Sequence, residues 1–127
     1  MTYEALQHGR EVVLLNEATI LAASLAAADW KPIKQHWSKN MRFQCVVEDS
    51  VAGSAPNLMI DIEMYLISPD SVSKLGELTI IGDGVYELYT EALTTRFPFP
   101  MIRAKPRDMT DYTSAVITLV GTGDKEN

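Results

Sequence analysis

The sequence has few of the residues on which active sites and disulfide-stapled folds depend. It contains one cysteine, Cys45, and two histidines, His8 and His36. A single cysteine cannot form an intramolecular disulfide, so nothing in the chain requires an oxidising compartment. Neither histidine lies in a metal-ligand spacing such as H-x-x-x-H or C-x-x-C. We therefore expect no disulfide, no bound metal and no cofactor.

Long apolar runs and an excess of basic residues are also missing. No run reaches the roughly 18 residues of a membrane span, and residues 1–10 are too polar for a signal peptide. The chain has 17 acidic and 11 basic residues, a net charge of −6. A protein that binds a phosphate backbone needs a basic face, so we expect neither a nucleic-acid ligand nor a membrane partner. We expect a protein made in the cytosol.

Catalytic motifs are absent as well. The chain has no G-x-S-x-G nucleophile elbow, and its serines fall mostly in predicted turns. The G-D-G at 82–84 lies between two predicted strands, so it indicates a hairpin turn and not a phosphate-binding loop. Asp61 and Glu63 lie on the polar side of one predicted strand, where paired carboxylates usually face solvent. These absences predict that the protein is not an enzyme.

The strongest pattern present is the alternation of apolar and polar residues over 41–49 and again over 57–67. Alternation with a period of two places one set of side chains on each face of a sheet. Residues 50–56 between these runs include glycine, serine and proline, so the pattern predicts an antiparallel hairpin with a loop at 50–56. We expect the following side chains to be buried: Met41, Phe43, Cys45, Leu58, Ile60, Ile62 and Met64.

The rest of the chain gives further short strands separated by turn signals. Residues 17–30 are ambiguous, because their alanines favour a helix while their loose patterning suits an extended edge; we prefer the extended form. Residues 1–10 form either a short helix or an ordered arm. The strand and turn spacing is typical of all-β sandwiches and barrels. We expect a single domain over 1–127. Residues 11–121 are expected to form an antiparallel β-sandwich of seven to eight strands, and residues 122–127 a frayed tail. The strands are expected at 11–16, 30–33, 41–49, 57–67, 74–81, 85–91, 101–105 and 112–121, with a rigid extended segment at 94–100 and turns at 68–73, 82–84 and 106–111.

Several aromatic residues fall in predicted loops. Trp37 lies in the polar segment 34–40, and Phe97 and Phe99 lie in a proline-stiffened segment. Aromatic side chains on rigid loops lose little entropy on docking and often anchor interfaces, but they equally cap the ends of a core. Both alternatives stay open. The aromatic residues that are candidates for a carbohydrate platform are Trp30, Trp37, Tyr65, Tyr86, Tyr89, Phe97 and Phe99.

The order of these features resembles the small jelly-roll structural proteins of tailed bacteriophage particles, including capsid cement, or decoration, proteins. The segments that carry the resemblance are VLLN, WKPI, MRFQCVVED, SVAGSAPNLMIDIEMYLISPDS, LGELTIIGDGVYELYTEAL, FPFPMIRAKP and SAVITLVG, covering residues 11–121. The resemblance implies a jelly-roll form of the sandwich. It also implies a virion protein that is assembled in the host cytoplasm and located on the capsid surface.

The resemblance further implies that the major capsid protein is the partner and that the chain self-associates, as a trimer in preference to a dimer. Repeated modest contacts would then add up to firm attachment. The expected interface residues are Trp37, Phe97, Phe99 and Arg103. The alternative is a carbohydrate- or receptor-binding β-sandwich module of a phage tail or fibre.

Overall fold

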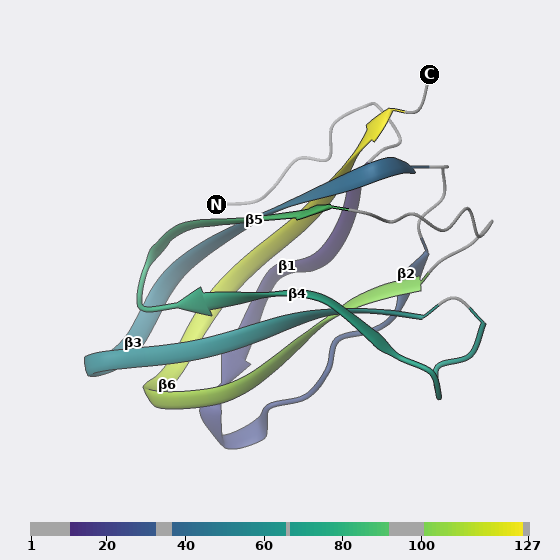
Figure 1. The fold of residues 1–127 in the computed structure, drawn as a ribbon. Helices are drawn as coiled ribbons and strands as arrows, with labels where there is room; N and C mark the ends of the chain where they lie inside the picture. The colour runs from purple at the N-terminus through teal and green to yellow at the C-terminus, as the bar shows by residue number, and fades with distance from the viewer. Residues whose placement is uncertain (1–10, 33–36, 66, 92–100, 126–127) are drawn as a thin grey trace.

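The structure, a computed structural model, describes residues 11–32, 37–65, 67–91 and 101–125, with the backbone alone described at 37–40, 91 and 123–125. Over these residues it is almost entirely antiparallel β-sheet with one short 3-10 turn (Figure 1). The elements are β1 (Glu11–Leu21), η1 (Ala22–Ser24), β2 (Lys31–Pro32), β3 (Trp37–Tyr65), β4 (Ser73–Ile80), β5 (Gly84–Glu91) and β6 (Met101–Lys125).

Two long strands, β3 and β6, organise the sheet. They pair with each other from Trp37 opposite Lys125 to Tyr65 opposite Met101, so they form one long antiparallel ribbon. Most of the shifts in their register lie between Glu48 and Met59. At this point the ribbon bends back on itself (Figure 1).

The bend divides the sheet into two facing halves (Figure 1). In the first, which we call the β5 half, the strand order is β1, the end of β6, the start of β3, and β5. In the second, the β4 half, the order is β2, the start of β6, the end of β3, and β4. Each half therefore takes one stretch from each of the two long strands.

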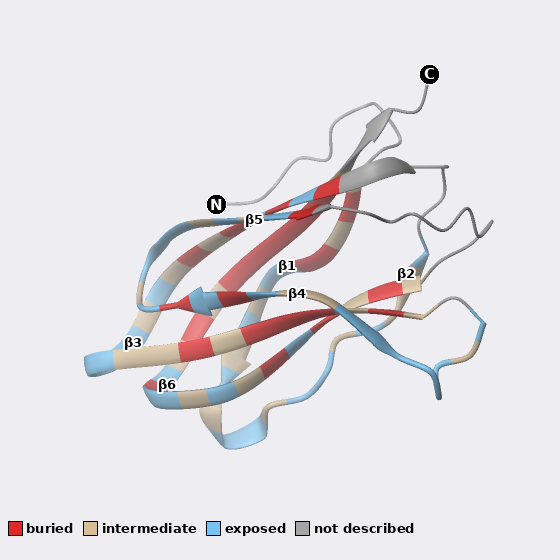
Figure 2. Cartoon of the chain, viewed as in Figure 1, coloured by how far each residue is buried: buried red, intermediate tan, exposed pale blue. Residues whose placement is uncertain are grey.

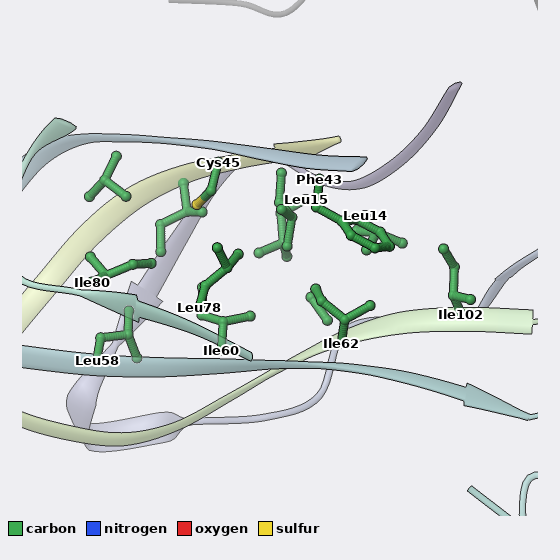
Figure 3. Packing of buried hydrophobic residues seen from close by; sticks show 14 of the residues in the cluster. Leu14, Leu15, Phe43, Cys45, Leu58, Ile60, Ile62, Leu78, Ile80 and Ile102 are labelled. Atoms are coloured by element: carbon green, nitrogen blue, oxygen red, sulfur yellow. The ribbon is translucent and has the colours of Figure 1, made fainter. Parts of the chain in front are cut away.

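The hydrophobic core fills the space between the two halves. Phe43 and Cys45 point inward from the β5 half, and Ile60, Ile62 and Ile102 point inward from the β4 half (Figure 3). Buried and more exposed residues alternate along β3 and β6, as the pleat of a strand requires (Figure 2). All seven side chains that the alternation predicts to be inside are buried, which confirms that prediction.

The predicted hairpin between 41–49 and 57–67 is wrong. These two runs belong to one continuous strand, β3, and pair with different stretches of β6 instead of with each other. Residues 50–56 are the bend of the ribbon and are strand, not loop. The glycine, serine and proline there were correct signals of a change in direction. They do not distinguish a turn within a hairpin from a bend of a paired ribbon.

The strand count is corrected in the same way. The segments 101–105 and 112–121, with the predicted turn at 106–111 between them, are one strand, β6. The described part of the chain therefore has six strands, where seven to eight were expected. Strand β6 also continues past the expected start of the tail, to Lys125. Within 17–30 the extended form holds up to Leu21, followed by the short η1 and no α-helix. The segments 1–10 and 94–100 lie outside the described residues.

The bends place aspartates in an unusual backbone conformation. Asp49 in β3 has a φ of 53°, and Asp108 and Asp111 in β6 have φ of 52° and 51°. Aspartate tolerates this left-handed region better than most residues, and β-branched residues tolerate it poorly. Acidic residues therefore suit the places where the long strands bend.

We expect Asp49→Val to lower the free energy of unfolding by about 1 kcal/mol more than Asp49→Gly does, because only valine opposes the positive φ. Urea denaturation of both variants measures the difference. The same two exchanges at Asp70, which is also exposed and is not among the positive-φ residues, are the control. Equal costs for valine and glycine at Asp49 would show that the bend does not impose the conformation.

Candidate functional site

Charged side chains form a cross-strand network on the solvent side of the β4 half. They come from three neighbouring strands, β4, β3 and β6. In this half the even-numbered residues of β3 and β6 point into the core, so the odd-numbered ones share the outer face. We call this network the ionic face, made up of Asp61, Glu63, Lys74, Glu77, Arg103 and Arg107.

Asp61 lies at the centre of the ionic face and is buried. Its Oδ2 accepts a hydrogen bond from Arg107 Nε at 2.8 Å, and Lys74 Nζ lies 3.4 Å from its Oδ1. The second contact is an ion pair without hydrogen-bond alignment, so among the described residues Oδ1 accepts no hydrogen bond. Burial alone raises the pKa of Asp61, but Arg107 and Lys74 outweigh burial and hold the pKa below its usual value. The carboxylate is therefore charged at neutral pH.

Arg107 links Asp61 to the edge strand β4. Its Nη2 donates to Glu77 Oε2 at 2.6 Å, and its Nη1 donates to the neighbouring Asp108. Lys74 Nζ also donates to Glu77, at 2.8 Å. The hydrogen bonds to Asp61 and Asp108 raise the pKa of Arg107. The network thus ties three strands together on their exposed side.

Arg103 occupies a second part of the ionic face. Its Nε donates to Glu63 Oε1 at 2.8 Å, and its guanidinium lies 4.2 Å from the centre of the Trp30 ring. Tyr65 meets Trp30 edge to face, with ring centres 4.6 Å apart. Trp30 comes immediately before the two-residue strand β2. Cation–π and aromatic contacts therefore fasten this short edge strand to the sheet.

The chemistry available on the ionic face is limited. Each cation of the network lies beside at least one carboxylate, so the arrangement satisfies its own charges.

Elsewhere in the fold, burial raises the pKa of Cys45 to about 12, so this thiol is not a nucleophile at neutral pH. Within the described ranges no three metal-ligating side chains gather, and no helix is long and apolar enough to cross a membrane.

The outer side of the β5 half is different in character. Here valines from four adjacent strands lie on one face, with Val13 opposite Val120 and Val46 opposite Val85. Polar residues separate the two pairs, since Val120 lies opposite Gln44 and Val46 opposite Thr118 across β3 and β6. Val120 is buried although it is not part of the central core cluster, and Val85 is 61% exposed. We call this surface the valine face, made up of Val13, Val46, Val85, Val116 and Val120.

Of the residues expected at an interface, only Arg103 is described in full. Its guanidinium donates to Glu63 and lies over the Trp30 ring, so it already has partners within the chain. Trp37 begins β3, but its side chain is outside the described residues, as are Phe97 and Phe99. The four are therefore not seen together, and their interface role stays a prediction.

The other aromatic candidates are scattered over the fold. The Tyr86 hydroxyl donates to Gly82 O at 2.7 Å and accepts from Ile81 N at 3.1 Å, so it fixes the turn between β4 and β5. Tyr89 is exposed, with the Arg42 guanidinium 6.0 Å from its ring centre. Among the candidates whose side chains are described, Trp30 and Tyr65 are in ring contact.

Sequence reasoning missed Arg107, Lys74 and the valine face. The local sequence predicts a turn at 106–111, where Arg107 lies. The pairing of Asp61 with cations on β4 and β6 depends on a register that no local pattern provides. The available signal was the run of charged residues at odd positions in 103–107. Comparisons of the chain with protein-family models, with curated proteins and with solved structures found no match.

Proposed function

We propose that this chain is a non-enzymatic structural protein of a bacteriophage particle. In this proposal it binds the outer surface of the capsid as a cement, or decoration, protein and strengthens contacts between major capsid subunits. It acts as a homo-oligomer, a trimer in preference to a dimer, and needs no cofactor. Its place is the capsid surface of a particle assembled in the host cytoplasm.

The observation that carries the proposal is the order of the strands. If β3 and β6 are each counted as two segments, the chain has eight segments, numbered in sequence. The β5 half then has the order 1-8-3-6 and the β4 half the order 2-7-4-5. This interleaved order supports the proposal that the fold is a jelly-roll sandwich, an architecture common in viral capsid proteins. Because one fold serves many functions, the proposal also needs a surface suited to binding.

The valine face is the surface that we propose for attachment to the capsid. The valines of this face that are at least partly exposed, Val13, Val46, Val85 and Val116, gain free energy when a partner covers them. The ionic face, by contrast, already satisfies its charges internally and gains little from a partner. An oligomer that presents several valine faces would combine modest contacts into firm attachment.

Particle-binding measurements test this proposal. Val85→Glu is expected to reduce binding to particles that lack the protein by roughly tenfold or more, because a charge would be buried without a partner. Val85 is 61% exposed, so the variant should fold. Thr79→Glu adds the same charge to an exposed position of β4, in the other half, and is the matched control. Co-sedimentation with particles measures the bound fraction.

Two results would contradict the proposal at different levels. If Val85→Glu and Thr79→Glu bind like the unaltered protein, the valine face is not the attachment surface. If the unaltered protein does not bind particles at all, the capsid role itself fails.

A carbohydrate- or receptor-binding module of a phage tail or fibre is the second candidate. The contact between Trp30 and Tyr65, with Arg103 and Glu63 beside it, favours this function, since sugars stack on aromatic rings and hydrogen-bond to charged side chains. Binding to a glycan array that is lost in Tyr65→Ala, with particle binding unchanged, would support the module over the cement protein.

A further inference from the structure

Four strands of the folded sheet have one side unpaired among the described residues. They are β1 and β5 in one half and β2 and β4 in the other. An edge strand presents free N–H and C=O groups to any extended chain that approaches it. Proteins usually protect such edges with bulges, proline, lysine or very short strands.

Three of the four edges carry such protection. Strand β1 has two shifts of register, with Glu17 at a φ of 47°. Strand β2 has only two residues, one of which is Pro32. Strand β4 carries Lys74, and its pairing with β3 is shifted between Ile62 and Glu63.

Strand β5 has no bulge, proline or lysine and is protected only by acidic side chains, of which Glu87 lies near its middle. Its pairing with β3 runs without a shift from Asn40 opposite Glu91 to Val47 opposite Gly84. Its sequence, GVYELYTE, has neither proline nor lysine. Val85 and Tyr89, on the outer side of the strand, are 61% and 51% exposed. A regular, eight-residue edge with exposed apolar side chains is suited to accept another strand.

We propose that the free edge of β5 binds an extended segment of another protein, which adds to the sheet as an antiparallel strand. The segment has a lysine or arginine opposite Glu87, flanked two residues away on each side by apolar or β-branched residues opposite Val85 and Tyr89. This site goes beyond attachment through the valine face and does not depend on the capsid assignment.

The charge of Glu87 selects the partner. Opposite charges directly across two strands stabilise the pairing, and like charges destabilise it. If two copies of β5 paired about a two-fold axis in the central register, Glu87 of one copy would face Glu87 of the other. The net charge of −6 further opposes self-pairing. A basic segment of another protein therefore fits this edge better than a second copy does.

The edge is also held in place before any partner arrives. On its inner side, Leu88 packs so closely on Gly76 that a Cβ there would lie 2.7 Å from Leu88 Cδ2. Tyr86 is fixed by its two hydrogen bonds to the turn before β5. On the outer side, Arg42 lies beside the Tyr89 ring. A preorganised edge loses little entropy when it binds a strand.

The test uses a capped nine-residue synthetic peptide of alternating valine and threonine with arginine at its centre. Two control peptides carry glutamate at the centre or N-methyl groups that block strand pairing. Backbone NMR resonances of the full chain report where each peptide binds, and titration gives its affinity. We expect the arginine peptide to shift the β5 amides and to bind about fivefold more tightly than the glutamate peptide. The N-methylated peptide should leave these amides unchanged.

The variant Glu87→Lys provides the reciprocal measurement, since Glu87 is exposed and its exchange should leave the fold intact. We expect this variant to prefer the glutamate peptide over the arginine peptide. Unchanged β5 resonances at millimolar arginine peptide, or the same peptide preference in both proteins, would overturn the proposal. Shifts of β5 that depend on protein concentration without any peptide would identify a second copy as the occupant and would also overturn it.

Discussion

Phe43→Ala is expected to lower the free energy of unfolding by about 3–5 kcal/mol, the range found for deletion of a buried aromatic ring. Phe43 is fully buried between the two halves of the sheet (Figure 3). The surrounding backbone belongs to paired strands and cannot collapse freely into the space that the ring leaves. Urea denaturation monitored by circular dichroism measures the loss.

Two comparisons make this prediction specific. Val51→Ala, at a position that is 56% exposed, should change stability by no more than about 0.5 kcal/mol. Gly121→Ala should cost about 1–3 kcal/mol, since a Cβ at Gly121 would lie 2.6 Å from the Phe43 ring. That cost should shrink when Phe43→Leu is also present. A cost for Gly121→Ala that is independent of residue 43 would contradict the packing described for this part of the core.

Asp61→Asn is expected to lower the free energy of unfolding by about 2 kcal/mol at neutral pH, because the variant loses a charged hydrogen bond with Arg107 and an ion pair with Lys74. The folded state lowers the pKa of Asp61, so its contribution is fully present above the unfolded value of about 3.9. As the pH falls through the still lower folded pKa, the carboxylate is protonated and the contribution is lost. The difference between the variant and the unaltered protein should therefore close in acid.

Denaturation of both proteins at a series of pH values measures this difference. Glu77→Gln is the control, since Glu77 is exposed and its exchange should have the smaller effect at every pH. A stability difference for Asp61→Asn that stays constant from neutral to acidic pH would mean that the charge of Asp61 does not stabilise the fold.

The sequence predicted which side chains of a strand point into the core, but it did not predict which strands pair with one another. Alternation in 41–49 and 57–67 placed the correct side chains in the core, because the pleat of a strand depends only on neighbouring residues. Pairing depends on segments far away in the chain. At the bend, for example, Ala55 N donates to Asp111 Oδ2 at 2.6 Å, and Gly53 leaves room for the same carboxylate. No local pattern around Gly53 and Pro56 predicts this contact, so the local pattern alone predicts a hairpin loop where the ribbon bends.

The same limit applies to the candidate surfaces: the face on which a residue lies was predictable, and its partners on other strands were not. Asp61 and Glu63 lie, as predicted, on the side of β3 opposite its core residues. The expectation that both carboxylates face solvent is wrong for Asp61, which is buried. The partners of these carboxylates, Lys74, Arg103 and Arg107, were not predictable, because a shift of one residue in register would send these cations to the other face. The valine face was also missed, since its members come from four strands that are not adjacent in sequence.

Electron cryomicroscopy of the particles to which this chain is proposed to belong tests the capsid role most directly. The proposed function predicts density for the folded sheet on the outside of the capsid, where neighbouring major capsid subunits meet, with the valine face toward the shell. It further predicts several copies around each local symmetry axis, three in preference to two. Density for the chain in the tail or fibres, or its absence from purified particles, would contradict the capsid role.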